Sequence, residues 1–448
     1  MTGLAWLVLE TPRWEPPDDL TPKGLEAITT RAFAIVAGLG GVALLVIAYR
    51  RQRAVEAEAQ RAELTVVRED TKLFNERFTT AYSELGSEHA AVRLGAIHAL
   101  AHLADDAPSD ELVQMVIDVL CAYLRMPYDL APDPLPKKTT TARREEHRAR
   151  KLDFAAFREV RHTVIRVIGN HLREPTRWRG RNYDFTGVEF DGGSFHGAEF
   201  TGGYVSFRFA RFKGRMSFDG VTFSGGQVSF DGADFCGERV SFRFARFAGS
   251  QVYFRFSTLS CQVSFENAKF ISGQVKFDRA RFASELVRFD RSAFVGGQLS
   301  FDLVRFIKGR VDFNGARFTG GSLGFKGARF SGSQVDFSGA EFSGSQVDFS
   351  LAVFSGGEVT FSGSSFSGSQ VSFSGAGFSG SQVKFRLAVF SGGHVSFRNS
   401  VFSGGQVSFI DAVGTPPSGL LGSLEKGGSQ VIVLPALWKN RQGGQGLK

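Results

Sequence analysis

Phenylalanine recurs in this chain at a fixed spacing, and this repeat constrains the fold more than any other feature. From Phe223 to Phe409 the steps between successive phenylalanines alternate, almost without interruption, between five and seven residues, which gives a period of twelve. A fixed period of this kind is typical of a solenoid, in which each repeat packs on its neighbours. Most of the 46 Phe and 53 Gly belong to this region, so roughly the first 180 residues form a separate compositional zone.

The residues around each phenylalanine predict which side chains point inward. Most phenylalanines follow Ala or Val by two positions, as in Ala340/Phe342. Residues two apart on an extended segment point to the same side, so each unit is predicted to bury one small and one large apolar side chain. The Ser, Gly, Asp, Arg and Gln residues between them are expected to face water. The predicted core includes Phe342, Phe349, Phe354, Phe361, Phe366, Phe373, Phe378 and Phe385.

The first units carry a family resemblance. Phe185, Phe190, Phe195 and Phe200 are all five residues apart, in the segment DFTGVEFDGGSFHGAEF. This segment resembles the pentapeptide-repeat family, and the resemblance covers about half of the chain. It implies a mainly β fold, a right-handed quadrilateral β-helix with four pentapeptides per coil. Because alternate units have seven residues, such a coil would need 24 residues here and would bulge at two opposite corners.

The 24-residue coil makes further expectations concrete. Each phenylalanine should stack on the one 24 positions later, for example Phe349 on Phe373. Coils at the spacing of neighbouring strands, about 4.8 Å, would form a rod of roughly 48 Å if there are about ten of them. Local distortion is expected at two six-residue steps, which end at Phe218 and Phe265.

An uncharged stretch of eighteen residues, which begins at Ala32 and ends at Tyr49, precedes the repeat. As a helix it would span about 27 Å, enough for the core of a bilayer. It is followed directly by Arg50, Arg51 and Arg53. A cleaved signal peptide is the alternative, but its charges precede the apolar run, and no small-residue cleavage site follows this one. We therefore predict a single-pass helix in the cell membrane, with the bulk of the chain in the cytoplasm.

Several helices are predicted between this stretch and the repeat. A polar stalk over residues 52–85 should continue the membrane helix, because it is rich in Ala, Glu and Arg and lacks Gly and Pro. Apolar periodicity predicts two short helices over 90–104 and 111–125, which look like one armadillo- or HEAT-type unit. A further helix over 154–172 should cap the first coil. The segment from Glu76 to Arg125 resembles the helical part that precedes the repeats in membrane-anchored actinobacterial pentapeptide-repeat proteins.

These predictions divide the chain into seven parts. They are a short irregular segment (1–31), the transmembrane helix (32–49), the helical stalk and HEAT-like unit (50–126), a linker (127–153), the capping helix (154–182), the β-solenoid (183–413), and a C-terminal cap and tail (414–448). A final strand is expected within residues 429–434, and residues 441–448 are expected to be disordered.

No catalytic constellation is found in the sequence. The recurring Ser-Gly-Ser is a periodic turn and lacks the strand–turn–helix context of a nucleophile elbow. His98 and His102 could share a helical face, but the glutamate of a metalloprotease helix is replaced by Ala99. The 3 cysteines lack metal-ligand spacing and favour a reducing compartment over a disulfide framework. We expect a non-catalytic protein without cofactor or metal.

Charge suggests where a partner could bind. The net charge is +8, and basic residues outnumber acidic ones about two to one between Val205 and Phe330. Two RFARF segments supply the candidate interaction residues, which are Arg208, Arg211, Arg243 and Arg246. Because this rod is not acidic, the DNA mimicry of gyrase-protecting family members is not expected.

Two functions remain. We expect a membrane-tethered scaffold or protein-interaction module with an unknown protein partner. The alternative is electrostatic binding of anionic lipid or nucleic acid by the basic N-terminal half of the solenoid. Few aromatic residues are predicted on the outer face, which weakens the nucleic-acid case. They are Phe209, Phe244, Tyr253 and Phe256.

Overall fold

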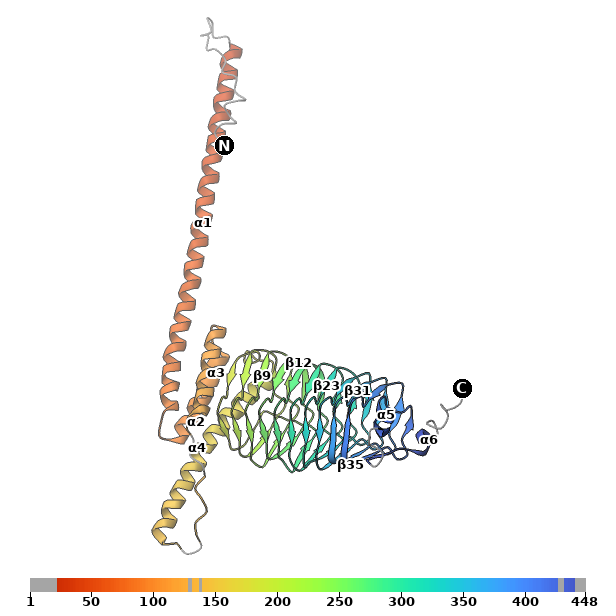
Figure 1. The fold of residues 1–448 in the computed structure, drawn as a ribbon. Coiled ribbons are helices and arrows are strands. Elements are labelled where there is room, and N and C mark those ends of the chain that lie inside the picture. Colours follow the sequence, from red (N-terminus) through yellow and green to blue (C-terminus); the bar gives the residue numbers. More distant parts are fainter. Residues whose placement is uncertain (1–21, 128–130, 137–138, 426–430, 440–448) are drawn as a thin grey trace. The chain divides into compact units, whose positions relative to one another are not determined.

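The computed structural model describes residues 22–127, 131–136, 139–425 and 431–439, in two units, Met1–Leu73 and Phe74–Lys448. The first unit holds most of α1 (Pro22–Leu85), a continuous helix of 64 residues (Figure 1). Among the described helices, α1 is the one long enough and apolar enough to cross a membrane. The expected irregular segment is wrong for residues 22–31, because the helix begins at Pro22, and a proline fits the first turn of a helix. Residues 1–21 lie outside the described part.

The apolar stretch continues into the stalk without a break, as predicted. No Gly or Pro interrupts α1 between Gln52 and Leu85. The last turns of α1, which belong to the second unit, bury Phe74, Ala81 and Leu85. The polar part of α1 is therefore a helix that ends in the hydrophobic core of the second unit.

Three helices follow in the second unit. α2 (Ala90–Asp105) and α3 (Asp110–Arg125) lie within one residue of their predicted bounds. α4 (Thr141–Arg173) packs on both and begins well before the expected residue 154, so the linker prediction is wrong from Thr141 onward. The charge-rich run after Thr141 is helical because Arg, Glu and Ala are good helix formers and because the Thr140 side chain accepts a bond from the backbone N–H of Arg143.

The repeat region is a parallel β-solenoid built from two sheets. One sheet contains β1 (Tyr183–Asp184), β4 (Glu199–Phe200), β5 (Tyr204–Ser206), β8 (Thr222–Phe223), β9 (Gln227–Ser229), β12 (Arg246–Tyr253), β15 (Lys269–Lys276), β18 (Ala293–Phe294), β19 (Gln298–Ser300), β22 (Arg317–Phe318), β23 (Ser322–Gly324), β26 (Glu341–Ser343), β27 (Gln346–Asp348), β30 (Ser365–Ser367), β31 (Gln370–Ser372), β33 (Val389–Ser391), β34 (His394–Ser396) and β36 (Val413–Gly414). The other contains β2 (Glu189–Phe190), β3 (Gly193–Ser194), β6 (Arg211–Phe212), β7 (Arg215–Ser217), β10 (Asp234–Phe235), β11 (Arg239–Ser241), β13 (Thr258–Leu259), β14 (Gln262–Ser264), β16 (Arg281–Phe282), β17 (Leu286–Arg288), β20 (Arg305–Phe306), β21 (Arg310–Asp312), β24 (Arg329–Phe330), β25 (Gln334–Asp336), β28 (Val353–Phe354), β29 (Glu358–Thr360), β32 (Gly377–Lys384), β35 (Val401–Ser408) and β37 (Ile432–Val433).

The predicted coil of 24 residues is confirmed by the strand register. Arg281 pairs with Arg305, and Arg305 pairs with Arg329. The coils near the N-terminal end are one or two residues shorter, since Phe190 pairs with Phe212 and Phe212 with Phe235. The 22-residue coil follows from the five-residue spacing of the first units, and the 23-residue coil from the six-residue step that ends at Phe218. The parallel pairing continues through both.

Four columns of phenylalanine rings fill the solenoid. We name them A, B, C and D in chain order, after Phe349, Phe354, Phe361 and Phe366. Within column A, the rings of Phe349 and Phe373 stack with 4.8 Å between centroids, and across the coil Phe349 meets Phe361 edge to face at 5.9 Å. The eight phenylalanines predicted as core are each 0% exposed. The interior is thus an aromatic stack with Ala and Val beside it, interrupted in column B by the buried Leu259.

The two step lengths produce two kinds of corner. Each five-residue step, from A to B or from C to D, makes a tight turn whose middle residue has a left-handed φ, as at Gly339 (+65°) and Leu351 (+58°). Each seven-residue step makes a wide bend that strands such as β12 follow, with register shifts beside Ala248. The wide bends alternate with the tight corners, so the predicted bulges lie at two opposite corners.

Both ends of the solenoid are covered. α4 lies against β3 and β4, where a Cβ at Gly169 would be 3.0 Å from the carbonyl oxygen of Ser194. α5 (Leu420–Glu425), β37 and α6 (Ala436–Lys439) follow the last coil, and the buried Trp438 packs on Phe390 and Phe409. β37 is the expected final strand, while residues 426–430 and 440–448, including the predicted disordered tail, lie outside the described residues.

The helical unit belongs to the N-terminal cap, which the sequence did not predict. The Gln114 side chain on α3 donates to the carbonyl of Asn182 and accepts from its N–H. Arg125, also on α3, pairs with Asp184 in β1. α2, α3 and α4 therefore form one body with the first coil.

Candidate interaction surface

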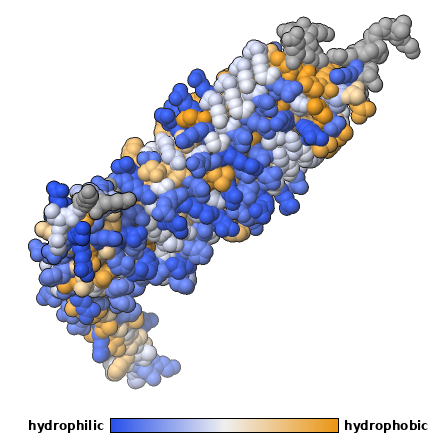
Figure 2. All heavy atoms as spheres, turned by 90° about the horizontal axis from the view of Figure 1, so that it is seen from below, coloured by the Kyte–Doolittle hydropathy of each residue, from blue (hydrophilic) through white to orange (hydrophobic). Residues whose placement is uncertain are grey.

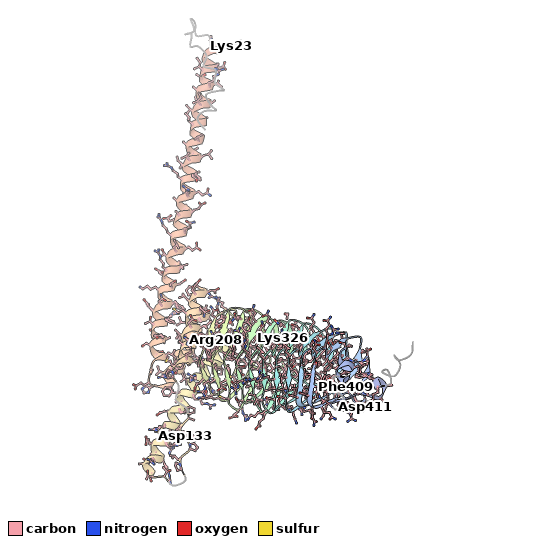
Figure 3. All side chains as sticks on the ribbon, viewed as in Figure 1. Lys23, Asp133, Arg208, Lys326, Phe409 and Asp411 are labelled. Atoms are coloured by element: carbon pink, nitrogen blue, oxygen red, sulfur yellow. The ribbon has the colours of Figure 1, made fainter. Side chains whose placement is uncertain are left out.

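The outward residues of the solenoid form columns, because each coil repeats the last. On the tight corner between columns A and B, which we call the A–B edge, the backbone N–H of each left-handed residue donates to the next coil, as from Phe209 to the carbonyl of Asp231. The corner between columns C and D, the C–D edge, repeats this pattern from Phe244 to Glu266. Arg208 and Lys326 occupy equivalent positions on the A–B edge, several coils apart (Figure 3).

The structure separates the four predicted arginines. Arg208 and Arg211 lie at the A–B edge, whereas Arg243 and Arg246 lie at the C–D edge. Arg211 forms an ion pair with Glu189 at 3.2 Å, and Arg243 forms one with Glu266 at 3.2 Å. The two RFARF segments do not make one basic surface, because six repeat steps, or one and a half coils, separate them and place them on opposite corners.

Three phenylalanines predicted on the outer face are exposed and have left-handed backbones. These are Phe209, Phe244 and Phe256. The Phe209 ring, 58% exposed, lies over the next coil, where a Cβ at Gly232 would be 2.6 Å from it. The Arg208 guanidinium lies 5.4 Å from the Phe209 ring centroid. The left-handed backbone of Phe209 costs about 1–2 kcal/mol. The contacts of its ring with Gly232 and with the Arg208 guanidinium act against this cost.

A basic ladder that the sequence reasoning missed lies on the B face, the outward side of the strands in column B. Arg281, Arg305 and Arg329 occupy one register position in β16, β20 and β24 and are exposed. Within the described residues none of the three forms an ion pair with a carboxylate. Like charges on directly neighbouring strands destabilise a sheet. The signal was available, since an arginine precedes phenylalanine at three positions 24 residues apart.

The character of the B face changes along the solenoid. The residues just after column B in these three coils are Ala283, Ile307 and Ser331, so this part of the face carries no carboxylate. Beyond Arg329 the ladder position holds Val353 and later Val401, which is 59% exposed. Figure 2 shows hydrophilic residues over much of the solenoid and hydrophobic residues gathered toward its C-terminal end. The ladder is therefore a bounded basic patch.

The membrane-flanking arginines lie on α1. Arg50, Arg51 and Arg53 are exposed along this helix. The Arg53 guanidinium lies 5.8 Å from the centroid of the Tyr49 ring. A cation and an aromatic ring at the end of an apolar stretch are typical of a membrane interface.

The cysteines are not activated nucleophiles. Burial raises the pKa of the Cys121 thiol to about 12 and that of Cys261 to about 11. Both thiols are protonated at neutral pH, and a protonated thiol is a poor nucleophile and metal ligand. Among the described residues, no group of three or more His, Cys, Asp or Glu could hold a metal ion, and His98 and His102 are both exposed.

The rate of alkylation should distinguish the buried thiols from the exposed thiol of Cys236. In the native chain at neutral pH, we expect iodoacetamide to modify the exposed Cys236 at least about a thousandfold faster than Cys121, because a pKa near 12 leaves very little thiolate. Mass spectrometry of timed digests measures the rates. The chain unfolded in guanidinium is the control and should react at all three cysteines, whereas equal rates in the native chain would contradict this burial.

Comparison of the chain with protein-family models, with curated proteins and with solved structures found no match.

Proposed function

We propose that this chain is a membrane-tethered, non-catalytic scaffold of the pentapeptide-repeat type, whose outer faces bind a protein partner. One observation carries the proposal: apart from Leu259 in column B, the rings of neighbouring coils stack along the solenoid, for example Phe354 on Phe378 at 4.7 Å between centroids. Apolar side chains fill the interior, so a partner binds from outside. A rigid rod with register-matched outer columns is suited to repeated side-chain contacts.

The repeat geometry supports the family assignment. Each coil has four sides, and its tight corners are five-residue steps with a small residue before the second phenylalanine, as at Ala352 and Phe354. The two-residue extensions are confined to the wide bends, where β12 and β32 run through the corner. This is a pentapeptide coil lengthened at opposite corners.

The proposed membrane anchor is the apolar part of α1. Its apolar residues from Ala32 to Tyr49 are followed by Arg50, Arg51 and Arg53, and we place this basic side and the solenoid in the cytoplasm. The chain should pellet with membranes after extraction in alkaline carbonate, and a variant lacking residues 32–49 should remain in the supernatant. Release of the intact chain by carbonate would contradict the tether.

Site-specific photocrosslinking tests the scaffold. A benzophenone amino acid at Ser331, Gln334 or Gln346 samples three different faces. In native membranes we expect one face to crosslink to a discrete protein and the other two to give little product. Crosslinking at the level of the unsubstituted chain from all faces would contradict a protein-binding role for the solenoid.

The arginine ladder favours a second candidate function, the binding of a polyanion by the B face. Replacing Arg281, Arg305 and Arg329 together by Gln should weaken heparin binding by about a hundredfold, because each basic residue contributes ~1 kcal/mol at an anionic surface. The salt concentration that elutes the chain from heparin measures this loss.

A second triple variant controls for net charge. Replacing Arg215, Arg310 and Arg317 by Gln removes the same charge at arginines that already have carboxylate partners, and it should change elution little. Competition by single-stranded DNA or by phosphatidylserine vesicles then distinguishes nucleic acid from lipid. Equal losses in both triple variants would refute a specific role for the ladder.

A further inference from the structure

A pocket of about 700 Å³ lies in the helical part of the second unit, away from the outer columns of the solenoid. Its wall comes from α2, α3, three residues between α3 and α4, and the part of α4 from Arg150 to Arg161. This volume falls within the range of small-molecule sites. The lining residues are Arg93, Tyr123, Met126, Pro127, Pro132, Arg150, Asp153, Phe154, Phe157 and Arg161.

The arginines of the pocket are held in place by the fold. The Arg93 guanidinium lies 4.6 Å from the Phe157 ring centroid, and its terminal nitrogen donates to the Tyr123 hydroxyl at 3.1 Å. Its Nε donates to the Ser87 carbonyl. Arg161 is only 5% exposed and donates to the carbonyl of Glu189 at 3.0 Å. Fixed guanidinium groups lose little entropy when they bind an anion.

The remaining wall is largely aromatic and apolar. Tyr123, Phe154 and Phe157 supply three rings, and the pocket holds three arginines against one carboxylate, that of Asp153. Pro132 lines one side of the pocket, and the next residue, Asp133, is tied to α4, because a ring nitrogen of His147 lies 2.9 Å from its carbonyl oxygen (Figure 3). The pocket therefore combines a flat apolar lining with an excess of positive charge.

We propose that this pocket binds a small organic anion with a flat apolar body. Its carboxylate or phosphate group is held by Arg93 and Arg161, and its body lies against the rings of Phe154 and Phe157. A site with aromatic walls and a few convergent polar groups binds ligands of this type. Because Arg161 also bonds to β2 in the first coil, the site lies where the cap meets the solenoid. This site is independent of the proposed scaffold function.

Calorimetry on the full chain in detergent micelles tests the proposal with phenyl phosphate as the probe. We expect binding at least tenfold tighter than that of phenol or of inorganic phosphate, since each control lacks one half of the recognised structure. Arg93→Gln should weaken phenyl phosphate binding at least about tenfold, the loss expected when a charged hydrogen bond is removed. Arg150→Gln, at the exposed rim and already paired with Glu146, should weaken it less.

Matched variants separate binding from folding. Arg144→Gln removes an exposed arginine of α4 that does not line the pocket. This variant should bind phenyl phosphate with unchanged affinity. Phe157→Leu keeps most of the apolar volume but removes the ring, and it should weaken binding severalfold even if Arg93→Gln fails to fold. The proposal is overturned if the intact chain does not bind phenyl phosphate at ~10 mM, if phenol binds as tightly, or if the folded pocket variants bind like Arg144→Gln.

Discussion

Replacing Phe349 by alanine is expected to lower the free energy of unfolding by about 3–5 kcal/mol, the cost of removing a large side chain from a packed core. Phe349 is 0% exposed. Its ring stacks on Phe325 at 4.6 Å and on Phe373 at 4.8 Å, with Phe361 edge to face at 5.9 Å. The cavity cannot collapse easily, because the backbone spacing of the coils is set by their parallel hydrogen bonds.

Gln346→Ala is the matched control, three residues earlier in the same coil. Its side chain is exposed at the start of β27, so we expect a change within about 0.5 kcal/mol. Native-state proteolysis measures both effects, and it suits a solenoid because repeat arrays open locally. Equal susceptibility of the two variants would contradict the assignment of inward and outward residues.

Gly357→Ala should destabilise the solenoid by roughly 4 kcal/mol or more, because substitutions that strain the backbone or force it to move are among the few that reach such values. Gly357 lies in a wide bend with φ +75°, and a Cβ there would be 2.1 Å from the carbonyl oxygen of Ser333 in the preceding coil. This contact is with a backbone atom, so no side-chain rotation relieves it. The coils would have to separate locally, which breaks their hydrogen bonds.

Two other glycines separate the cost of the left-handed backbone from the cost of the clash with the preceding coil. Gly339 has φ +65° but open space around its Cβ position, so Gly339→Ala should cost only the left-handed strain of about 1–2 kcal/mol. Gly377 has open space and no left-handed φ, and Gly377→Ala should be neutral or stabilise by ~0.4–1 kcal/mol through the unfolded chain. Thermal unfolding followed by circular dichroism ranks the three variants by stability. A cost at Gly357 no larger than that at Gly339 would exclude the backbone clash.

Local pattern predicted much of the architecture. Burial of Phe349 and its neighbours followed from residue alternation, because a side-chain direction on an extended segment depends only on parity along the chain. The coil length followed from adding four step lengths. The start of α4 was missed because the charged run after Thr141 has no apolar face, and its helix is fixed by propensity and by the Thr140 cap.

The charged surface was predicted less well than the core, because neighbours on a solenoid are residues one coil apart. Arg208 and Arg243 looked alike in sequence, yet they lie on different corners. Arg281 and Arg305 were not connected by the sequence analysis, although they lie one 24-residue coil apart and are strand neighbours. Only the register decides which charges are adjacent.

By itself, the sequence determined the phenylalanine core, the 24-residue coil and the apolar stretch of α1, since each is written as a local period or a composition. The tertiary structure alone decided that the helical unit belongs to the cap, through contacts such as Gln114 with Asn182, and that Arg93, Tyr123 and Arg161 share one pocket. These contacts join residues about 30 to 70 positions apart. Which distant side chains meet depends on how whole helices pack, and no local pattern encodes that packing.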